Sequence, residues 1–331
     1  MTQVTRILAT SATCAALVVA ASAQAPDGVE VLTVRNNFFV VAGGGGNVGV
    51  QVGDDGVVVV DAGSAASAPA VVAAIKRITP KPIRYIINTG PDADHVGGNE
   101  TLSKAGETLF GPARLGGQRQ EFMGPVAAIL ATEGVLRRMT APSGSPQAYP
   151  SGALPTEAFH YARKALYLNG EGIEALHQPA AHTDGDAFVF FRRSDVVMAG
   201  DVFDASQFPV IDVERGGTID GEIAALGRLS ELAIATVPIV SREAGTIVVP
   251  GHGHLGDQYD VIEYRDMVTI IRDRVRDLVN AGRSLEQVKA ATPAKGYAGR
   301  YGNGSGGWTA DRFVEAVYRS LAAVKEGSVT R

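Results

Sequence analysis

Cysteine is nearly absent from the sequence, with one residue, Cys14, among 331. It falls in an N-terminal stretch in which a single charge precedes an apolar run and then the small residues "ASAQA". This layout predicts a secretory signal peptide over residues 1–23, cleaved after Ala23 or, as the alternative, after Ala25. The mature chain, 24–331, would then have no thiol, which excludes disulfides and cysteine metal ligands.

A strong excess of charge of either sign is also missing, since the formal net charge is −5 and charged residues make up 20%. This balance gives no electrostatic basis for binding nucleic acid. The apolar run near the N-terminus is too short, and too rich in alanine, serine and threonine, for a strong transmembrane helix. We therefore expect a periplasmic or secreted protein with a small-molecule substrate, no nucleic-acid partner and no stable membrane anchor after signal cleavage. The sequence carries no signal for an oligomeric state.

A serine-nucleophile motif of the G-x-S-x-G kind is absent as well, which argues against a serine hydrolase. Hydrophobic residues, in contrast, make up 45%, as in a globular protein with a substantial core.

Strand and helix patterns alternate along the mature chain and favour an α/β architecture. Residues 29–63 predict three or four short antiparallel strands, with glycines 43–46 in a hairpin turn. The segment 104–160 is less periodic, and we interpret it as an elaboration of the same domain. The remaining patterns predict strands at 83–88, 187–192, 195–203 and 245–254, and helices at 65–78, 125–139, 259–279 and 309–324.

Acidic residues and a histidine crowd the segment "GPDADHVGG", residues 90–98. Asp92 and Asp94 repel each other there unless a cation or strong hydrogen bonds hold them. Asp94 and His95 would point to opposite faces of a strand, so only a bent backbone brings them together, and the flanking glycines and proline allow such bends.

Other histidines and acids stand in glycine-rich turns at strand boundaries. These are His182 in "AAHTDGD", Asp201 after "VVMAG" and His252 in "VPGHGH". Imidazole and carboxylate ligands suit zinc and other first-row divalent ions. The sequence therefore predicts a metal site built from Asp92, Asp94, His95, His182, Asp201 and His252. Asp61, which follows "VVVV", is interpreted as a hydrogen-bonding scaffold residue for the metal loop.

In these motifs the chain resembles the metallo-β-lactamase-fold hydrolases. The first motif of that family reads Thr-His-x-His-x-Asp-His before Gly-Gly-Asn, and this chain has Thr89 through His95 and then Gly97, Gly98 and Asn99. The later motif residues follow in order along the chain. The resemblance implies a four-layer αβ/βα sandwich, with two mixed β-sheets flanked by helices and the site at one edge of the sheets.

The chain departs from the family's pattern at two positions, Gly90 and Asp92, where the family has histidines. The resemblance implies that these histidines, with the residue matching His182, hold the first metal. It also implies that Asp94, His95 and His252 hold the second metal, with Asp201 between both. The second set is intact, whereas the first retains only His182 and Asp201, and the role of Asp92 stays open between ligand and turn cap.

Three hypotheses follow from this incomplete ligand set. The first is a hydrolase with one zinc whose bound water attacks an ester, lactone, thioester or lactam, with Asp94, Asp92 and His182 as candidate catalytic residues. The second keeps two metals, with Asp92 as an oxygen ligand, and would favour iron or manganese more than an all-histidine site would. The third is a degenerate relative that acts as a periplasmic binding module.

Overall fold

The structure, a computed structural model, describes residues 28–109, 113–115, 118–120, 126–140, 149–236, 245–302 and 307–329. Side chains are described up to residue 322, except in the short strands at 113–115 and 118–120. The predicted signal peptide over residues 1–23 lies outside these ranges. None of the described helices is long and apolar enough to cross a membrane.

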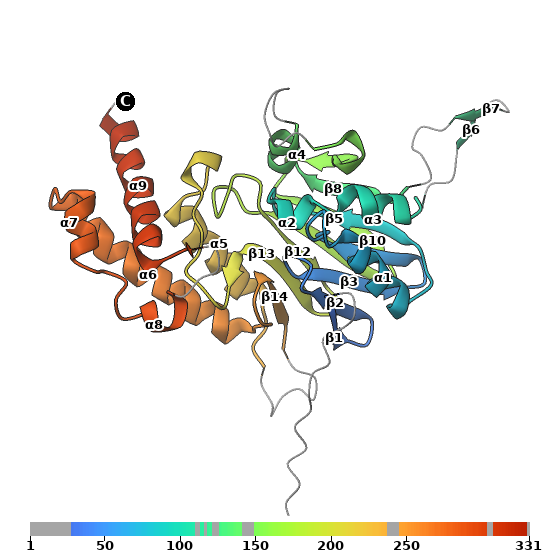
Figure 1. The fold of residues 1–331 in the computed structure, drawn as a ribbon, viewed down its shortest axis with the longest axis horizontal. Helices are drawn as coiled ribbons and strands as arrows, with labels where there is room; N and C mark the ends of the chain where they lie inside the picture. The colour runs from blue at the N-terminus through green and yellow to red at the C-terminus, as the bar shows by residue number, and fades with distance from the viewer. Residues whose placement is uncertain are drawn as a thin grey trace, which may run out of the picture.

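Two β-sheets dominate the described part of the chain (Figure 1). The seven-stranded sheet has the order β1 (Glu30–Arg35), β2 (Phe38–Ala42), β3 (Val48–Gly53), β4 (Gly56–Val60), β5 (Ile83–Ile87), β8 (Ala128–Thr132) and β9 (Glu157–Phe159). The five-stranded sheet has the order β10 (Arg163–Leu168), β11 (Glu171–His177), β12 (Ala187–Phe191), β13 (Val196–Asp204) and β14 (Ile247–His252). A separate two-stranded ribbon contains β6 (Ala113–Leu115) and β7 (Gln118–Gln120). Both large sheets are mixed, since antiparallel pairs continue into the parallel pairs β4–β5 and β13–β14.

Helices flank both large sheets (Figure 1). In chain order they are α1 (Ala68–Ile78), α2 (Ala93–Val96), α3 (Asn99–Ala105), α4 (Glu133–Met139), α5 (Ile219–Leu232), α6 (Gln258–Asn280), α7 (Leu285–Ala290), α8 (Ala298–Tyr301) and α9 (Ala310–Val329). Short 3-10 turns occur at Ser151–Ala153 and Val213–Arg215.

Three apolar clusters separate the layers of this sandwich. One joins α1, through residues such as Val71 and Ile75, to the outer face of the first sheet. The next lies between the two sheets, where Phe38 of β2 packs edge-on against Phe191 of β12. The last joins the second sheet to α5, α6 and α9. Three interfaces make four layers, which confirms the predicted αβ/βα sandwich.

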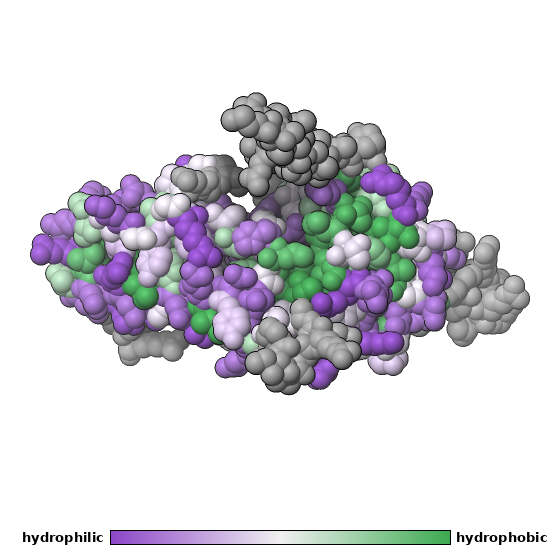
Figure 2. Space-filling model, turned by 90° about the horizontal axis from the view of Figure 1, so that it is seen from below, coloured by the Kyte–Doolittle hydropathy of each residue, from purple (hydrophilic) through white to green (hydrophobic). Residues whose placement is uncertain are grey.

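The surface differs between the two ends of the molecule (Figure 2). On the face shown there, hydrophobic residues gather toward the half that contains the first sheet, and the end formed by the C-terminal helices is mostly hydrophilic. Helix α6, which confirms the helix predicted over 259–279, has Val261, Tyr264, Met267, Val268, Ile271 and Val275 buried.

In the segment 125–139, predicted to be helical, the described part is a strand followed by a helix, so the prediction was right for Glu133–Met139 and wrong for Ala128–Thr132. Ala128–Thr132 forms β8, which pairs in parallel with β5 and β9 and is buried throughout. A short apolar run that is buried on both faces has no alternation to distinguish it from a helix. Only Glu133–Met139 is helical, with Thr132 as its N-cap. The sequence also gave no prediction for β9, β10 and β11.

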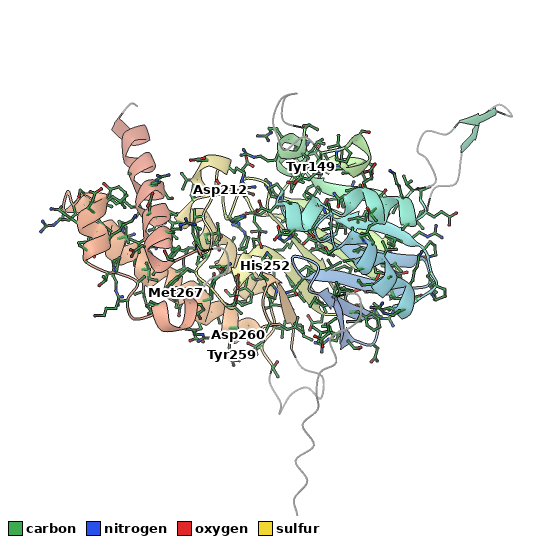
Figure 3. The ribbon with its side chains drawn as sticks, in the orientation of Figure 1. Tyr149, Asp212, His252, Tyr259, Asp260 and Met267 are labelled. Carbon is green, nitrogen blue, oxygen red and sulfur yellow. The ribbon has the colours of Figure 1, made fainter. Side chains whose placement is uncertain are left out.

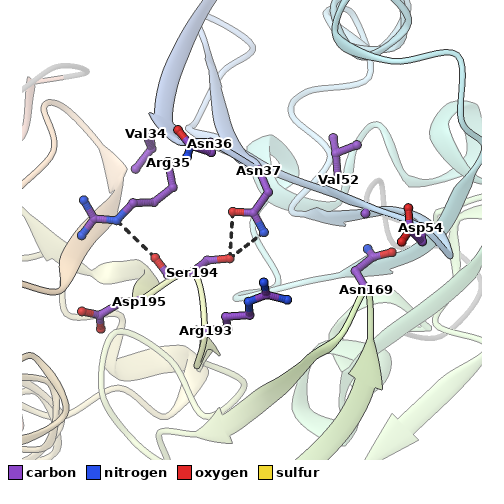
Figure 4. A pocket seen from close by; sticks show the side chains of 11 residues that line it. Val34, Arg35, Asn36, Asn37, Val52, Asp54, Asn169, Arg193, Ser194 and Asp195 are labelled. Atoms are coloured by element: carbon purple, nitrogen blue, oxygen red, sulfur yellow. Dashed lines mark hydrogen bonds between the residues drawn. The ribbon is translucent and has the colours of Figure 1, made fainter. Parts of the chain in front are cut away.

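A polar network joins the two sheets at an edge lined by none of the six predicted metal residues. It borders a cavity of about 810 Å³ (Figure 4), where the Asn37 amide and the Ser194 hydroxyl bond each other. Behind them, buried Glu171 of β11 accepts hydrogen bonds from Gln51 of β3 at 2.8 Å and from the Ser194 hydroxyl at 2.7 Å. The Arg193 and Ser194 backbone N–H groups donate to its other oxygen.

Glu171→Ala is expected to lower the free energy of unfolding by about 3 kcal/mol or more, because it leaves several buried hydrogen-bond donors without an acceptor. Glu174→Ala is the matched control, since among the described residues Glu174 pairs only with two arginines, whose side chains are 56% and 60% exposed. That change should cost about 1 kcal/mol or less. Urea unfolding of both variants checks the difference, and equal losses would contradict a specific role for the Glu171 network.

Candidate metal centre

The six predicted metal residues converge where the two halves of the sandwich meet. Asp94 and His95 lie on α2, and Asp92 immediately precedes it. His182 follows β11, Asp201 lies within β13, and His252 ends β14 (Figure 3). The bend expected in the first motif is a single helical turn. Two groups could each hold an ion, Asp94 with His95 and His252, and Asp92 with His182 and Asp201.

Asp201 depends on the glycine before it. Gly200 has a φ of +55° inside β13, a conformation that side chains rarely adopt. A Cβ at this position would also lie 2.7 Å from the Thr89 hydroxyl. The strand pairing of β13 with β14 shifts register at the same point. The glycine of "MAGD" therefore lets β13 bend and lets the first motif approach Asp201 closely.

The group around His95 has the spacing of metal ligands. His95 Nε2 lies 3.2 Å from Asp201 Oδ1, and His252 Nε2 lies 3.1 Å from Asp94 Oδ2 and 3.5 Å from Asp201 Oδ1. Around a tetrahedral ion with metal–ligand distances of about 2.0–2.1 Å, ligand atoms lie about 3.3 Å apart. His95 is 1% exposed, yet its Nε2 has no hydrogen-bond partner among the described residues, because Asp201 is near but not in hydrogen-bonding geometry. These residues therefore fit a divalent ion.

Asp61 sets the orientation of the His95 ring. Its carboxylate, 1% exposed, accepts the His95 Nδ1 proton at 2.8 Å and bonds from the Thr89 N–H at 2.8 Å and hydroxyl at 2.6 Å. This leaves Nε2 as the free nitrogen of the ring. Asp61 therefore has the scaffold position that the sequence predicts.

Asp61→Asn is expected to weaken zinc binding by about 10- to 100-fold, because an amide no longer enforces the tautomer that exposes Nε2. Isothermal titration with zinc measures the change. Unaltered affinity would show that Asp61 does not orient the ligand.

Protons compete with a metal ion for these histidines. Burial lowers the pKa of His95, but Asp201 and Asp61 outweigh it and raise the pKa well above the usual range. The hydrogen bond to Asp94 raises the pKa of His252. Ligating imidazoles must be neutral, so we expect metal affinity to rise with pH.

The group around His182 has the spacing of hydrogen bonds instead. His182 Nε2 lies 2.7 Å from Asp92 Oδ2, well below a ligand–ligand separation, and 3.9 Å from Asp201 Oδ2. Its Nδ1 bonds the Val210 carbonyl at 2.6 Å. The other Asp92 oxygen, Oδ1, accepts from Arg215 Nη1 at 2.5 Å. Asp92 stands at the N-cap of α2 but makes no capping hydrogen bond, so the turn-cap alternative was wrong.

The comparisons with known proteins agree with this layout. Residues 41–109 match the model of the metallo-beta-lactamase superfamily. The structure is similar to the stereoselective inverting sec-alkylsulfatase Pisa1 from Pseudomonas sp., with a TM-score of 0.61 and 15% identity, covering 88% of this chain and 50% of that chain. It is also similar to a metallo-beta-lactamase from Pontibacter korlensis, with a TM-score of 0.53 and 16% identity, covering 73% of this chain and 99% of that chain. The chain has the metallo-β-lactamase fold.

This chain spans half the length of the alkylsulfatase chain that it matches. A comparison with curated proteins gives no significant match. At these identities the similar structures establish the fold alone. Within this fold, the described residues include two groups of side chains that could each hold a metal ion.

Two residues near the site have no counterpart in the sequence prediction. Arg215 bonds Asp92 although 123 positions separate them, a pairing that no local motif indicates. Tyr149 (Figure 3) packs against the apolar cluster that includes Val135 and Met139. Burial raises the pKa of its phenol; the charge of Asp92 raises the pKa further, and the charge of Arg215 lowers it. The Tyr149 hydroxyl is therefore close enough to Asp92 and Arg215 to be affected by their charges. Tyr149 makes no hydrogen bond within the described part of the chain.

A buried carboxyl group lies behind His182. Glu222, in the first turn of α5, is 0% exposed, and neither of its carboxyl oxygens has a hydrogen-bond partner among the described residues. Burial raises its pKa well above the usual range, and Asp186 adds to the shift. Glu222 is therefore protonated in the folded protein at pH values where an exposed glutamate is ionised.

Glu222→Gln is expected to flatten the pH dependence of stability. The folded state holds this proton more tightly than the unfolded state, so the wild-type free energy of unfolding falls as pH rises above the ordinary glutamate pKa. This group contributes up to about 1.4 kcal/mol per pH unit between the two pKa values. Urea unfolding at several pH values measures the slope for both proteins. Parallel curves would contradict a neutral Glu222.

Proposed function

We propose that the chain is an exported hydrolase that uses one zinc ion, held by Asp94, His95, His252 and Asp201. The observation that carries the proposal is the unpartnered, buried Nε2 of His95, with the neighbouring ligand atoms 3.1–3.5 Å apart. When bound, the ion supplies Lewis acidity and lowers the pKa of a water molecule toward about 7. An ester, lactone, thioester or lactam carbonyl is the proposed target.

The chain's own residues have separate tasks in this proposal. Asp61 fixes the His95 ring, as described above. Asp94 has a side chain that is 34% exposed, and its pKa is lowered by the His252 hydrogen bond, so its carboxylate is ionised, as a metal ligand must be. Asp92 and His182, bonded to each other at 2.7 Å, line the other side of the site, where the remaining lone pairs of the Asp92 carboxylate can accept a hydrogen bond from water or substrate.

The competing function is a binding module without turnover. This alternative is favoured by the state of Asp92, because His182 and Arg215 engage both of its oxygens and leave the first metal position poorly suited to bind an ion. Zinc-loaded and chelated protein, assayed against ester, thioester, lactone and lactam substrates, separates the two. The proposal expects turnover that a chelator abolishes and zinc restores. No metal-dependent turnover across the panel, with ligand binding retained after chelation, would favour the binding module.

Export is proposed from the sequence of residues 1–23 alone. N-terminal sequencing of protein from the periplasmic fraction should begin near Gln24. A chain with an intact Met1 in the cytoplasmic fraction would contradict export without affecting the proposed chemistry.

A further inference from the structure

We propose that Arg215 takes the place of the first metal ion, so that the chain binds one metal ion and excludes a second. This inference rests on the proposed function only in assigning the metal to the group around His95. The guanidinium supplies the positive charge that a metal ion bound to Asp92 and His182 would otherwise supply. The first metal position, formed by Asp92, His182 and Asp201, therefore has its charge and hydrogen bonds satisfied without a metal ion.

The guanidinium is held in place by its own turn. Asp212 caps the 3-10 turn Val213–Arg215, accepting from the Arg215 N–H at 3.0 Å through one oxygen and from Arg215 Nε at 2.6 Å through the other. Two bonds from one carboxylate fix the side chain's direction. Arg215 Nη1 then reaches Asp92 Oδ1, so the arginine bridges two carboxylates.

The turn is also fastened to the segment that carries His182. The Asp212 and His182 backbones are bonded, Asp212 N–H to His182 carbonyl, at 3.0 Å. A Cβ on Gly217 would lie 2.1 Å from the same carbonyl, so only glycine allows this close packing. The segments that carry Arg215 and His182 are thus bonded to each other, and both side chains reach the Asp92 carboxylate.

The electrostatics favour the guanidinium over a metal ion. Both Asp92 oxygens are already engaged by protein groups, Oδ2 by His182 Nε2 at 2.7 Å and Oδ1 by Arg215 Nη1 at 2.5 Å. A guanidinium does not lose its proton in proteins, so an entering ion would meet a permanent cation. It would also have to separate His182 Nε2 from Asp92 Oδ2, which share a hydrogen bond at 2.7 Å.

The alternative is an ordinary surface ion pair that has no effect on metal binding. The chain offers a matched control in Arg138, which pairs with Asp184 at 3.0 Å. The side chains of Arg138 and Arg215 are each 31% exposed. Among the described residues Arg138 bonds Asp184 and forms no ion pair with Asp92, so its removal tests the loss of an arginine pair as such.

Metal content is the readout that decides between them. Wild-type protein, Arg215→Gln, Arg215→Lys and Arg138→Gln are stripped with chelator, reloaded with zinc, dialysed and analysed by plasma mass spectrometry. We expect about one zinc per chain in the wild type, Arg215→Lys and Arg138→Gln, and about two in Arg215→Gln. Circular dichroism checks that each variant is folded.

One zinc in folded Arg215→Gln would overturn the inference and leave the proposed function intact. If that variant does not fold, titration of the wild type with excess zinc still decides: a second binding event overturns the inference, and a single event supports it. A wild type without zinc, or a His252→Ala variant that keeps its zinc, would instead refute the proposed function.

Discussion

Replacing His95 with alanine is expected to weaken zinc binding by more than about 100-fold, beyond the effect of losing an outer partner such as Asp61. The change removes one of two imidazoles in the group around His95, and it is the one whose Nε2 is buried without a hydrogen-bond partner in the part of the chain that the structure describes. Hydrolysis should fall with metal content, and added zinc should not restore it at ordinary concentrations. Titration calorimetry and metal analysis measure both effects.

His254→Ala is the matched control for this experiment. His254 lies two positions after His252, is exposed, and bonds only the neighbouring Leu255 carbonyl within the described residues. The control should keep wild-type zinc content and affinity. If His95→Ala also kept its zinc, the ligand set would have been misassigned.

Rebuilding the first position should create a second zinc site. We expect a triple variant, Gly90→His with Asp92→His and Arg215→Gln, to bind about two zinc ions per chain. Gly90 has no positive φ, and a Cβ built on it would meet only Asp186 Oδ1 within 4 Å, at 3.8 Å. The backbone at Gly90 therefore accepts a side chain, and the two new histidines would complete a set of three imidazoles with His182. Neutral imidazole in place of Asp92 also removes its repulsion with neighbouring carboxylates.

The single variant Gly90→His distinguishes two possible reasons why the first metal position binds no ion: the guanidinium of Arg215 and the missing histidine ligand. With Arg215 and Asp92 unchanged, this single variant should still bind about one zinc, because the guanidinium remains. Metal analysis of the single and triple variants gives the comparison. Two ions in the single variant would show that a missing ligand, and not Arg215, keeps the first position free of metal.

Periodicity and strand-end chemistry predicted much of the fold and the approximate place of the site. The antiparallel strands over 29–63 and the glycine turn 43–46 are present, because alternation and turn residues are local signals. The strand β8 was mistaken for helix because its burial is decided by β5 and β9, which lie elsewhere in the chain. Local patterns do not carry such tertiary information.

The same limit explains what was missed at the site. The motif residues stand in recognisable turns, whereas Arg215 is one arginine in "VERGG" and gains its role from a contact with Asp92. Equally, the sequence left Asp92 open between ligand and cap. Its actual partners, His182 and Arg215, come from two distant loops.

The most direct test of a one-metal centre is an anomalous difference map from crystals grown with excess zinc, recorded at the zinc edge. The account predicts one strong peak per chain, surrounded by Asp94, His95, His252 and Asp201, with Arg215 still bonded to Asp92. A peak between His182 and Asp92, alone or beside the first, would contradict it.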